Sequence, residues 1–207
     1  MKRLLSLSLL LALTACSHTP ITNQPADIES WPSFVDQQSR LNHWQLQGKL
    51  GIRLPKNSPP GLAINWQQQE KQFQIRLSGF LGVGAAKIEG DSQQVSLMKG
   101  DEYYQATNSE QLTEQLLGMP ISLDSLMYWV RGLPDPNMKV LFRAHHENGT
   151  LSSLLQNDWE LSFQRYQTHG QWWLPGLIKG QRGDLKFTLS ITDWQSAFVS
   201  ANEDFSQ

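Results

Sequence analysis

The chain contains a single cysteine, Cys16, and its surroundings favour modification of the thiol over disulfide formation. It follows Leu13-Thr14-Ala15 at the end of an apolar run over residues 4–13, which begins behind the positive pair Lys2-Arg3. A charged start, a short apolar segment and a small-residue cleavage site are the features of a secretory signal. A lone thiol in an exported chain cannot form an intramolecular disulfide. Cys16 therefore remains a nucleophile at the membrane surface, where the signal ends.

The tetrapeptide Leu13-Thr14-Ala15-Cys16 resembles the lipobox of bacterial lipoproteins. The resemblance implies that the thiol is alkylated by diacylglycerol, that residues 1–15 are cleaved, and that the new amine is acylated. An ordinary signal peptide followed by an unmodified cysteine is the alternative. Several acyl chains give stable anchoring, because each buried CH₂ contributes about 0.8 kcal/mol. Lipoproteins retained in the inner membrane usually carry Asp after the lipidated cysteine; Ser17 stands here, which points to the periplasmic face of the outer membrane.

Other reactive side chains do not form a convincing catalytic or metal site. The cluster His145-His146-Glu147 lacks metal-ligand spacing and lies beside an expected turn. Asp124-Ser125, His43 and His169 have no Gly-x-Ser-x-Gly context. The glycines of segment 79–84 lack the Lys-Ser/Thr ending of a phosphate loop. We therefore expect no enzyme activity, no metal and no cofactor.

Composition indicates one exported domain on a tether. Removal of the signal with Lys2 and Arg3 leaves 15 basic and 19 acidic residues, a net charge of −4, without the basic stripe of a nucleic-acid-binding protein. Residues 16–30 contain two prolines and scattered polar residues, which is typical of a flexible tether behind the lipid. Residues 31–207 are long enough for a single domain, with nothing that requires more than a monomer.

Period-2 alternation dominates this domain and predicts strands with one apolar face. The most regular stretch is 44–54, where even positions are apolar or Gly and the others are mostly polar. Further alternating stretches cover 62–66, 73–77, 86–88, 95–97, 159–163 and 185–191. Asn148-Gly149 between two strand-like segments predicts a hairpin turn. Short, evenly spaced strands indicate one curved antiparallel sheet or an open barrel.

Three segments have helical spacing instead. They are residues 31–42, residues 109–117 ending before Gly118, and a segment that begins after Ser122 and ends near Gly132. A sheet with one apolar face needs a cover, so we expect a mainly β fold with some α (α+β), in which the helices lie over the concave side of the sheet.

Short motifs along the chain, in order behind the lipobox, are specific enough to suggest a family. They are Trp44-x-Leu46-x-Gly48-Lys49-Leu50, Leu117-Gly118-Met119-Pro120-Ile121, Leu123, Ser125-Leu126, Trp129, Gly132-Leu133-Pro134, Asp158-Trp159-Glu160 and Asp193-Trp194. Together they resemble the LolB family of outer-membrane lipoprotein receptors over about residues 30–196. The resemblance implies an open, strongly curved antiparallel sheet (an incomplete barrel) with a helical lid over a hydrophobic cavity.

The resemblance also implies a function. Members of the family accept lipoproteins from the periplasmic carrier LolA and insert their acyl chains into the outer-membrane phospholipid. They carry a protruding apolar loop with a leucine at its tip. The matching loop here is 78–84, with Leu81 at the tip and Phe80 where Pro is common. Two large apolar residues on a Gly-rich turn suggest a membrane-transfer wedge, and a tip folded back into the core is the alternative.

Inward strand faces and the lid supply candidates for an acyl-chain cavity, each of which plain core packing explains equally well. The candidates are Trp44, Leu46, Leu50, Ile52, Trp66, Phe73, Ile75, Leu77, Leu126, Met127 and Val130. Two other functions stay open: an outer-membrane scaffold lipoprotein that binds a protein partner without lipid transfer, and a lipid hydrolase. The hydrolase needs a nucleophile–base pair, which the sequence does not present.

Overall fold

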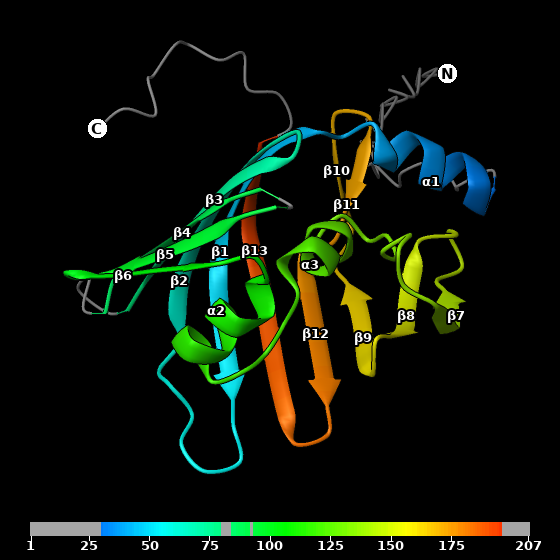
Figure 1. Cartoon of the computed structure of the whole chain (residues 1–207). Coiled ribbons are helices and arrows are strands. Elements are labelled where there is room, and N and C mark those ends of the chain that lie inside the picture. The colour runs from blue at the N-terminus through cyan, green and yellow to red at the C-terminus, as the bar shows by residue number, and fades with distance from the viewer. Residues whose placement is uncertain (1–29, 80–83, 92, 196–207) are drawn as a thin grey trace, which may run out of the picture.

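The computed structural model describes residues 30–79, 84–91 and 93–195, and in this part the chain forms one large antiparallel sheet (Figure 1). The strands of the sheet, in spatial order, are β6 (Glu102–Ala106), β5 (Val95–Lys99), β4 (Ala86–Gly90), β3 (Gln72–Ser78), β2 (Leu62–Gln69), β1 (His43–Arg53), β13 (Leu185–Gln195), β12 (Leu177–Arg182), β9 (Trp159–Gln164), β8 (Leu151–Gln156) and β7 (Val140–His145). A separate hairpin pairs β10 (Gln167–His169) with β11 (Trp172–Leu174). Because β6 and β7 end the sheet without pairing to each other, the predicted open sheet is confirmed.

The two longest strands, β1 and β13, lie beside each other in the middle of the sheet (Figure 1). Their register shifts between Gln47 and Gly48. A Cβ atom on Gly48 would lie 2.2 Å from the carbonyl oxygen of Ser190, so only glycine allows this close approach. The strand pair thus joins the two ends of the domain and forms the centre of the curved surface.

Strand β12 did not emerge from the alternation pattern, and Gly180 is the reason. Ile178 and Gly180 occupy successive inward positions, but the second has no side chain to reveal the pattern. The aromatic ring of Phe187, on the neighbouring strand β13, fills the space instead, 2.1 Å from where a Cβ atom of Gly180 would lie. Because Gly180 has no side chain, the alternation of apolar residues that would predict β12 is interrupted.

Three helices occur among the described residues: α1 (Trp31–Ser39), α2 (Ser109–Leu117) and α3 (Leu123–Trp129). The side chain of Ser122 caps α3 by accepting a hydrogen bond from the backbone N–H of Ser125, and α2 ends at Gly118 in the left-handed conformation, as the sequence predicted. None of the described helices is long and apolar enough to cross a membrane.

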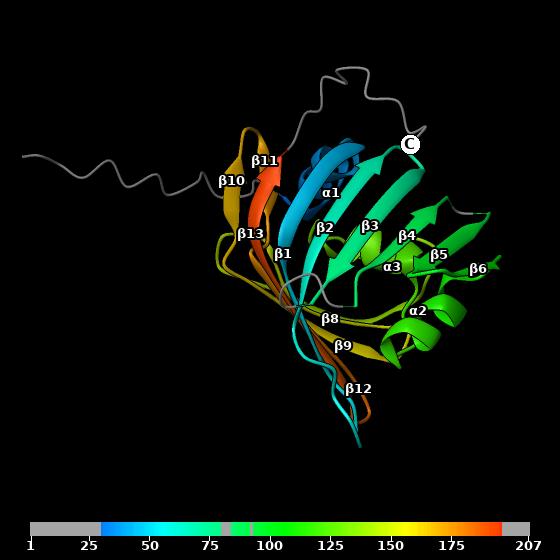
Figure 2. The ribbon, with the colours of Figure 1, turned by 90° about the vertical axis from the view of Figure 1, so that its left-hand side faces the viewer.

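Helices α2 and α3 cover the concave face of the sheet, as Figures 1 and 2 show from two sides. Helix α1 departs from the expectation that the helices lie over this face. Gln37 and Gln38 donate hydrogen bonds to the backbone carbonyls of Gln171 and Trp173, which places α1 against the β10–β11 hairpin. Its buried residues are only Phe34 and Gln38, so α1 has too narrow an apolar face to cover a curved sheet.

Candidate functional site

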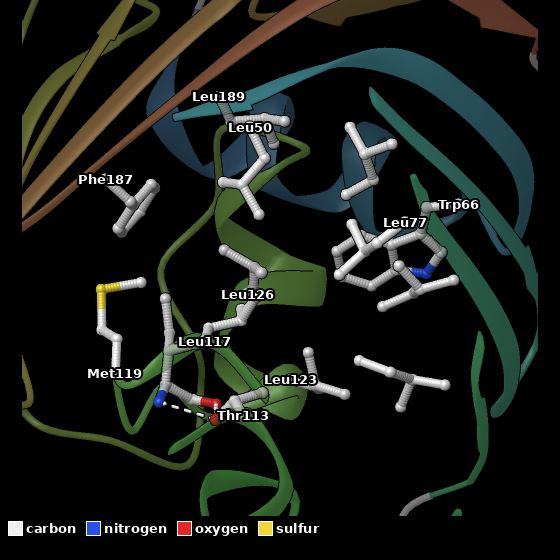
Figure 3. Close-up of a pocket in the computed structure, with 14 residues that line it drawn as sticks. Leu50, Trp66, Leu77, Thr113, Leu117, Met119, Leu123, Leu126, Phe187 and Leu189 are labelled. Atoms are coloured by element: carbon white, nitrogen blue, oxygen red, sulfur yellow. Dashed lines mark hydrogen bonds between the residues drawn. The ribbon is translucent and has the colours of Figure 1, made fainter. Parts of the chain in front are cut away.

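An apolar pocket lies between the concave face of the sheet and the two lid helices, α2 and α3 (Figure 3). The lining residues come from β1–β4, β13, α2, α3 and the connection between these helices. They are Leu50, Ile64, Trp66, Ile75, Leu77, Ile88, Thr113, Leu117, Met119, Ile121, Leu123, Leu126, Phe187 and Leu189. The free space is small, about 30 Å³, because the lid side chains reach down toward the sheet.

Thr113 is the single hydroxyl residue of the lining, and its oxygen is hydrogen-bonded within the protein. The hydroxyl accepts a hydrogen bond from the backbone N–H of Ile121 at 3.0 Å and lies 2.9 Å from the carbonyl oxygen of the same residue (Figure 3). The threonine therefore ties α2 to the connection that leads to α3. It leaves no free polar group for a ligand, so the pocket suits an apolar occupant.

Five of the eleven cavity candidates from the sequence line this pocket: Leu50, Trp66, Ile75, Leu77 and Leu126. The other six lie elsewhere. Trp44, Leu46, Ile52 and Val130 are buried in the core without lining the pocket, whereas Phe73 and Met127 pack against the core as partly buried residues. The two loop residues, Phe80 and Leu81, and the lipidation candidate Cys16 lie outside the described residues.

Nine lining residues were not among the candidates from the sequence. Ile64, Ile88 and Leu189 continue alternations that were recognised, so the pattern could have found them. Met119 and Ile121 belong to a connection without helix or strand periodicity. No sequence pattern indicates that this connection turns its side chains toward the sheet. Phe187 belongs to the same alternation as Leu189, and Thr113, Leu117 and Leu123 lie in the two lid helices.

A buried hydrogen-bond network fixes helix α3 to the sheet. The hydroxyl of Ser125 donates to the carboxylate of Asp135 at 2.7 Å. The side-chain oxygen of Gln156, on β8, accepts from the indole N–H of Trp129 at 3.0 Å and from the backbone N–H of Asp135 at 2.9 Å. Burial and the nearby Asp135 raise the pKa of Asp124. Because each of these buried polar groups has its partner, the network holds this end of the lid rigidly.

Arg131 adds a second attachment directly after α3. Its guanidinium donates to the backbone carbonyls of Met127 at 3.1 Å and Leu41 at 3.1 Å, and lies 3.5 Å from that of Gln38. The charged group is 5 % exposed and has no carboxylate partner among the described residues, and burial lowers its pKa to about 10. Tyr128 stacks against the guanidinium at 5.1 Å. Arg131 therefore joins the end of α3 to the chain that leads into β1.

The α2 side of the lid is attached more lightly. The guanidinium of Arg182, at the end of β12, donates to the backbone carbonyl of Pro120 at 2.6 Å and stacks on the ring of Trp159 at 4.9 Å. Gly118 lies close to Leu54, since a Cβ atom there would stand 2.8 Å from a methyl carbon of Leu54. One side-chain hydrogen bond and apolar contacts thus hold the connection to the sheet, whereas α3 is held to the sheet by a network of buried hydrogen bonds.

His145 and His146, which the sequence does not favour as metal ligands, contact other parts of the domain. The ring of His145 lies 4.6 Å from the ring of Trp31 in α1, and Nε2 of His146 lies 2.8 Å from the carbonyl oxygen of Phe163. Burial and the nearby Arg143 lower the pKa of His145. Within the described part of the chain, no three His, Cys, Asp or Glu side chains come together as metal ligands.

Structural comparison supports the fold at low sequence identity. A putative outer membrane lipoprotein-sorting protein domain from Vibrio parahaemolyticus superposes with a TM-score of 0.60 and 8% identity, over 84% of this chain and 95% of that one. A LolA superfamily protein from Nitrosomonas europaea gives a TM-score of 0.54 and 7% identity, over 82% and 94%. Both share the curved sheet architecture.

Sequence comparison identifies the family. The family model described as Outer membrane lipoprotein LolB matches residues 42–194. The outer-membrane lipoprotein LolB of Pseudomonas paraeruginosa is 39% identical over 196 residues, covering 92% of this chain and 94% of the relative. That of Pseudomonas savastanoi pv. phaseolicola is 36% identical over 201 residues, covering 94% and 96%. With this match over nearly its whole length, the chain belongs to the LolB family of outer-membrane lipoproteins.

Proposed function

We propose that this protein receives lipoproteins from the periplasmic carrier LolA and inserts their acyl chains into the outer membrane. The apolar pocket under the lid carries the proposal, because acyl chains that cross water expose apolar surface at about 25 cal/mol per Å². A lining whose single hydroxyl is already hydrogen-bonded within the protein suits such chains. The transfer breaks no covalent bond, so it needs neither a catalytic residue nor a cofactor.

The pocket must widen before it can hold cargo. Its free space of about 30 Å³ admits no more than a few water molecules, since one water needs about 10–15 Å³ of such space. The uneven attachment of the lid suggests how it opens. We infer that α3 stays fixed through Ser125 and Trp129, while α2 and the connection around Pro120 move away from the sheet. The hydrogen bond from Arg182 is then the latch of the closed state.

Cargo can move in one direction without nucleotide hydrolysis when the affinity for acyl chains rises at each step. If the pocket binds acyl chains more tightly than the carrier does, cargo moves to it spontaneously, and each tenfold step in affinity needs about 1.4 kcal/mol. The last step delivers the chains to a bilayer, which buries them completely. The loop tip with Phe80 and Leu81 is our candidate for the residues that touch the membrane at that step. It connects β3 to β4, two strands whose inward residues line the pocket.

The N-terminus places this activity at the membrane. We propose that residues 1–15 are a cleaved signal, that Cys16 carries the lipid, and that residues 16–30 tether the domain 31–207 to the periplasmic face of the outer membrane. The anchor decides where cargo is released and contributes nothing to the pocket. A protein with Cys16 replaced should therefore still accept cargo but deliver it poorly to membranes.

The test is cargo transfer from a loaded carrier to the mature chain with Cys16→Ala, followed by separation of the two proteins. We expect cargo to move to the wild-type pocket. The variant Leu126→Trp, which fills the pocket from α3, should accept much less, and Met98→Trp on the exposed outer face is the matched control. A Cys16→Ala chain that acquires no cargo would favour the scaffold function instead.

A further inference from the structure

The sheet edge formed by β7 exposes an unusual concentration of apolar side chains. Five large apolar residues are strongly exposed in the described part of the chain, and three of them fall within five positions. These are Met138 at 39%, Leu141 at 55% and Phe142 at 55%, which we call the β7 patch. Clustered apolar exposure at an edge, unlike a single exposed leucine, indicates a surface with a partner.

A groove of about 560 Å³ continues the patch across β8, β9, β12 and β13. Most of its lining residues, such as Glu160, Ser162 and Lys179, alternate with the buried inward residues of their strands, so the groove lies on the outer face of the sheet. Phe142 and Leu155 stand side by side at one end of it. Lys179 and Lys186 line the other end, on neighbouring strands. Neither lysine has a salt bridge within the described residues, and Glu160 is the one carboxylate of the lining. Apolar side chains next to free cations match the surface of an anionic bilayer.

Chain connectivity brings this surface close to the lipid anchor. The ring of Trp31, the first residue of α1, packs on His145 at 4.6 Å, and the guanidinium of Arg143 lies over it at 5.3 Å. Helix α1, which follows the tether in the sequence, thus begins beside β7. Residues 16–30 span at most about 50 Å when fully extended, at roughly 3.3 Å per residue. A bilayer that holds Cys16 is therefore within reach of the β7 patch.

The shape of β7 argues against a protein strand as the partner. Its pairing with β8 is interrupted between Val140 and Phe142, and again between Ala144 and His145. Two irregularities in a strand of six residues leave a poor template for strand addition, because bulges twist an edge away from further pairing. A bilayer needs no such register. Lys139 and Arg143, both exposed, add positive charge on either side of the apolar pair.

We propose that the β7 patch, together with Lys179 and Lys186, lies on the anionic phospholipid surface in which the anchor is inserted. The domain would then be held against the membrane by two points, the lipid and this patch, rather than swinging freely on the tether. The proposal rests on the lipidation of Cys16 that the proposed function includes. It concerns how the domain is oriented and leaves the pocket unchanged.

The test uses the lipidated mature protein in vesicles of phosphatidylethanolamine and phosphatidylglycerol. Phe142→Cys introduces the single free thiol, because the chain's own cysteine carries the lipid, and it is labelled with an environment-sensitive fluorophore. Tyr103→Cys, at 56% exposure on the opposite edge strand β6, is the matched control. We expect iodide to quench the label at 142 several-fold less than the label at 103. Adding Lys179→Glu and Lys186→Glu should remove most of this protection.

Equal quenching at the two positions would overturn the proposal. So would protection at 142 that grows with the protein-to-lipid ratio, which assigns β7 to a second copy, or protection that needs the carrier protein. Flotation of the vesicles reports the anchor separately, and cargo acceptance by the Cys16→Ala chain reports the pocket. Failure of the proposed function is thus recognised without reference to the β7 patch.

Discussion

Replacing the latch Arg182 by Met should loosen the lid without unfolding the sheet. The substitution keeps a long apolar stem on the ring of Trp159 but removes the hydrogen bond to the carbonyl of Pro120. A hydrogen bond from a charged donor contributes about 1.5–3 kcal/mol, and partial exposure of this one reduces that to about 1–2 kcal/mol. The ratio of open to closed lid should therefore rise about 5- to 30-fold.

Two measurements on the Arg182→Met variant test this. Amide hydrogen exchange across residues 112–121 should accelerate by that factor, while exchange in β1 and β13 stays as in the wild type. If the open lid is the minor, binding-competent state, the apparent affinity for a fluorescent acyl probe should increase in the same proportion. Arg53→Met is the control, since this exposed arginine has no hydrogen bond or ion pair from its side chain within the described residues.

Comparing exchange in residues 112–121 with exchange in β1 distinguishes a latch on the lid from a residue that stabilises the whole fold. Unchanged exchange in 112–121 would show that Arg182 does not hold the lid. Equal acceleration in β1 would show that the residue stabilises the whole fold, and the inference that α2 moves while α3 stays fixed would lose its support.

Three further substitutions test other parts of the molecule. Leu81→Glu should leave cargo acceptance intact and block delivery to vesicles; unimpaired delivery would refute the wedge. Gln156→Leu should lower the free energy of unfolding by about 2–4 kcal/mol in urea titrations, because the indole N–H of Trp129 and a backbone N–H lose their buried partner. Gly180→Ala should push the ring of Phe187 toward the pocket, costing about 1–3 kcal/mol and weakening binding of an acyl probe; unchanged binding would show that the ring has room elsewhere.

Features that depend on neighbours in the chain were readable from the sequence. Alternation from Trp44 to Leu54 describes β1, because successive side chains of a strand point to opposite faces. Ser122 and Gly118 mark the ends of the lid helices, because capping is a local hydrogen-bonding requirement. The fold class and the family followed from such local patterns in their order along the chain.

Features that depend on packing across the fold needed the tertiary structure. Trp44 and Trp66 look alike in an alternating pattern, yet only Trp66 lines the pocket, since the position of the lid decides which inward residues remain beside free space. The latch joins Arg182 to Pro120, which are 62 residues apart, and no periodicity connects them. The sequence alone determined the regularly alternating strands, the caps at Gly118 and Ser122, and the candidate lipid anchor at Cys16. Only the tertiary structure decided which apolar side chains form the pocket and how firmly each end of its lid is held, because contacts between distant segments set both.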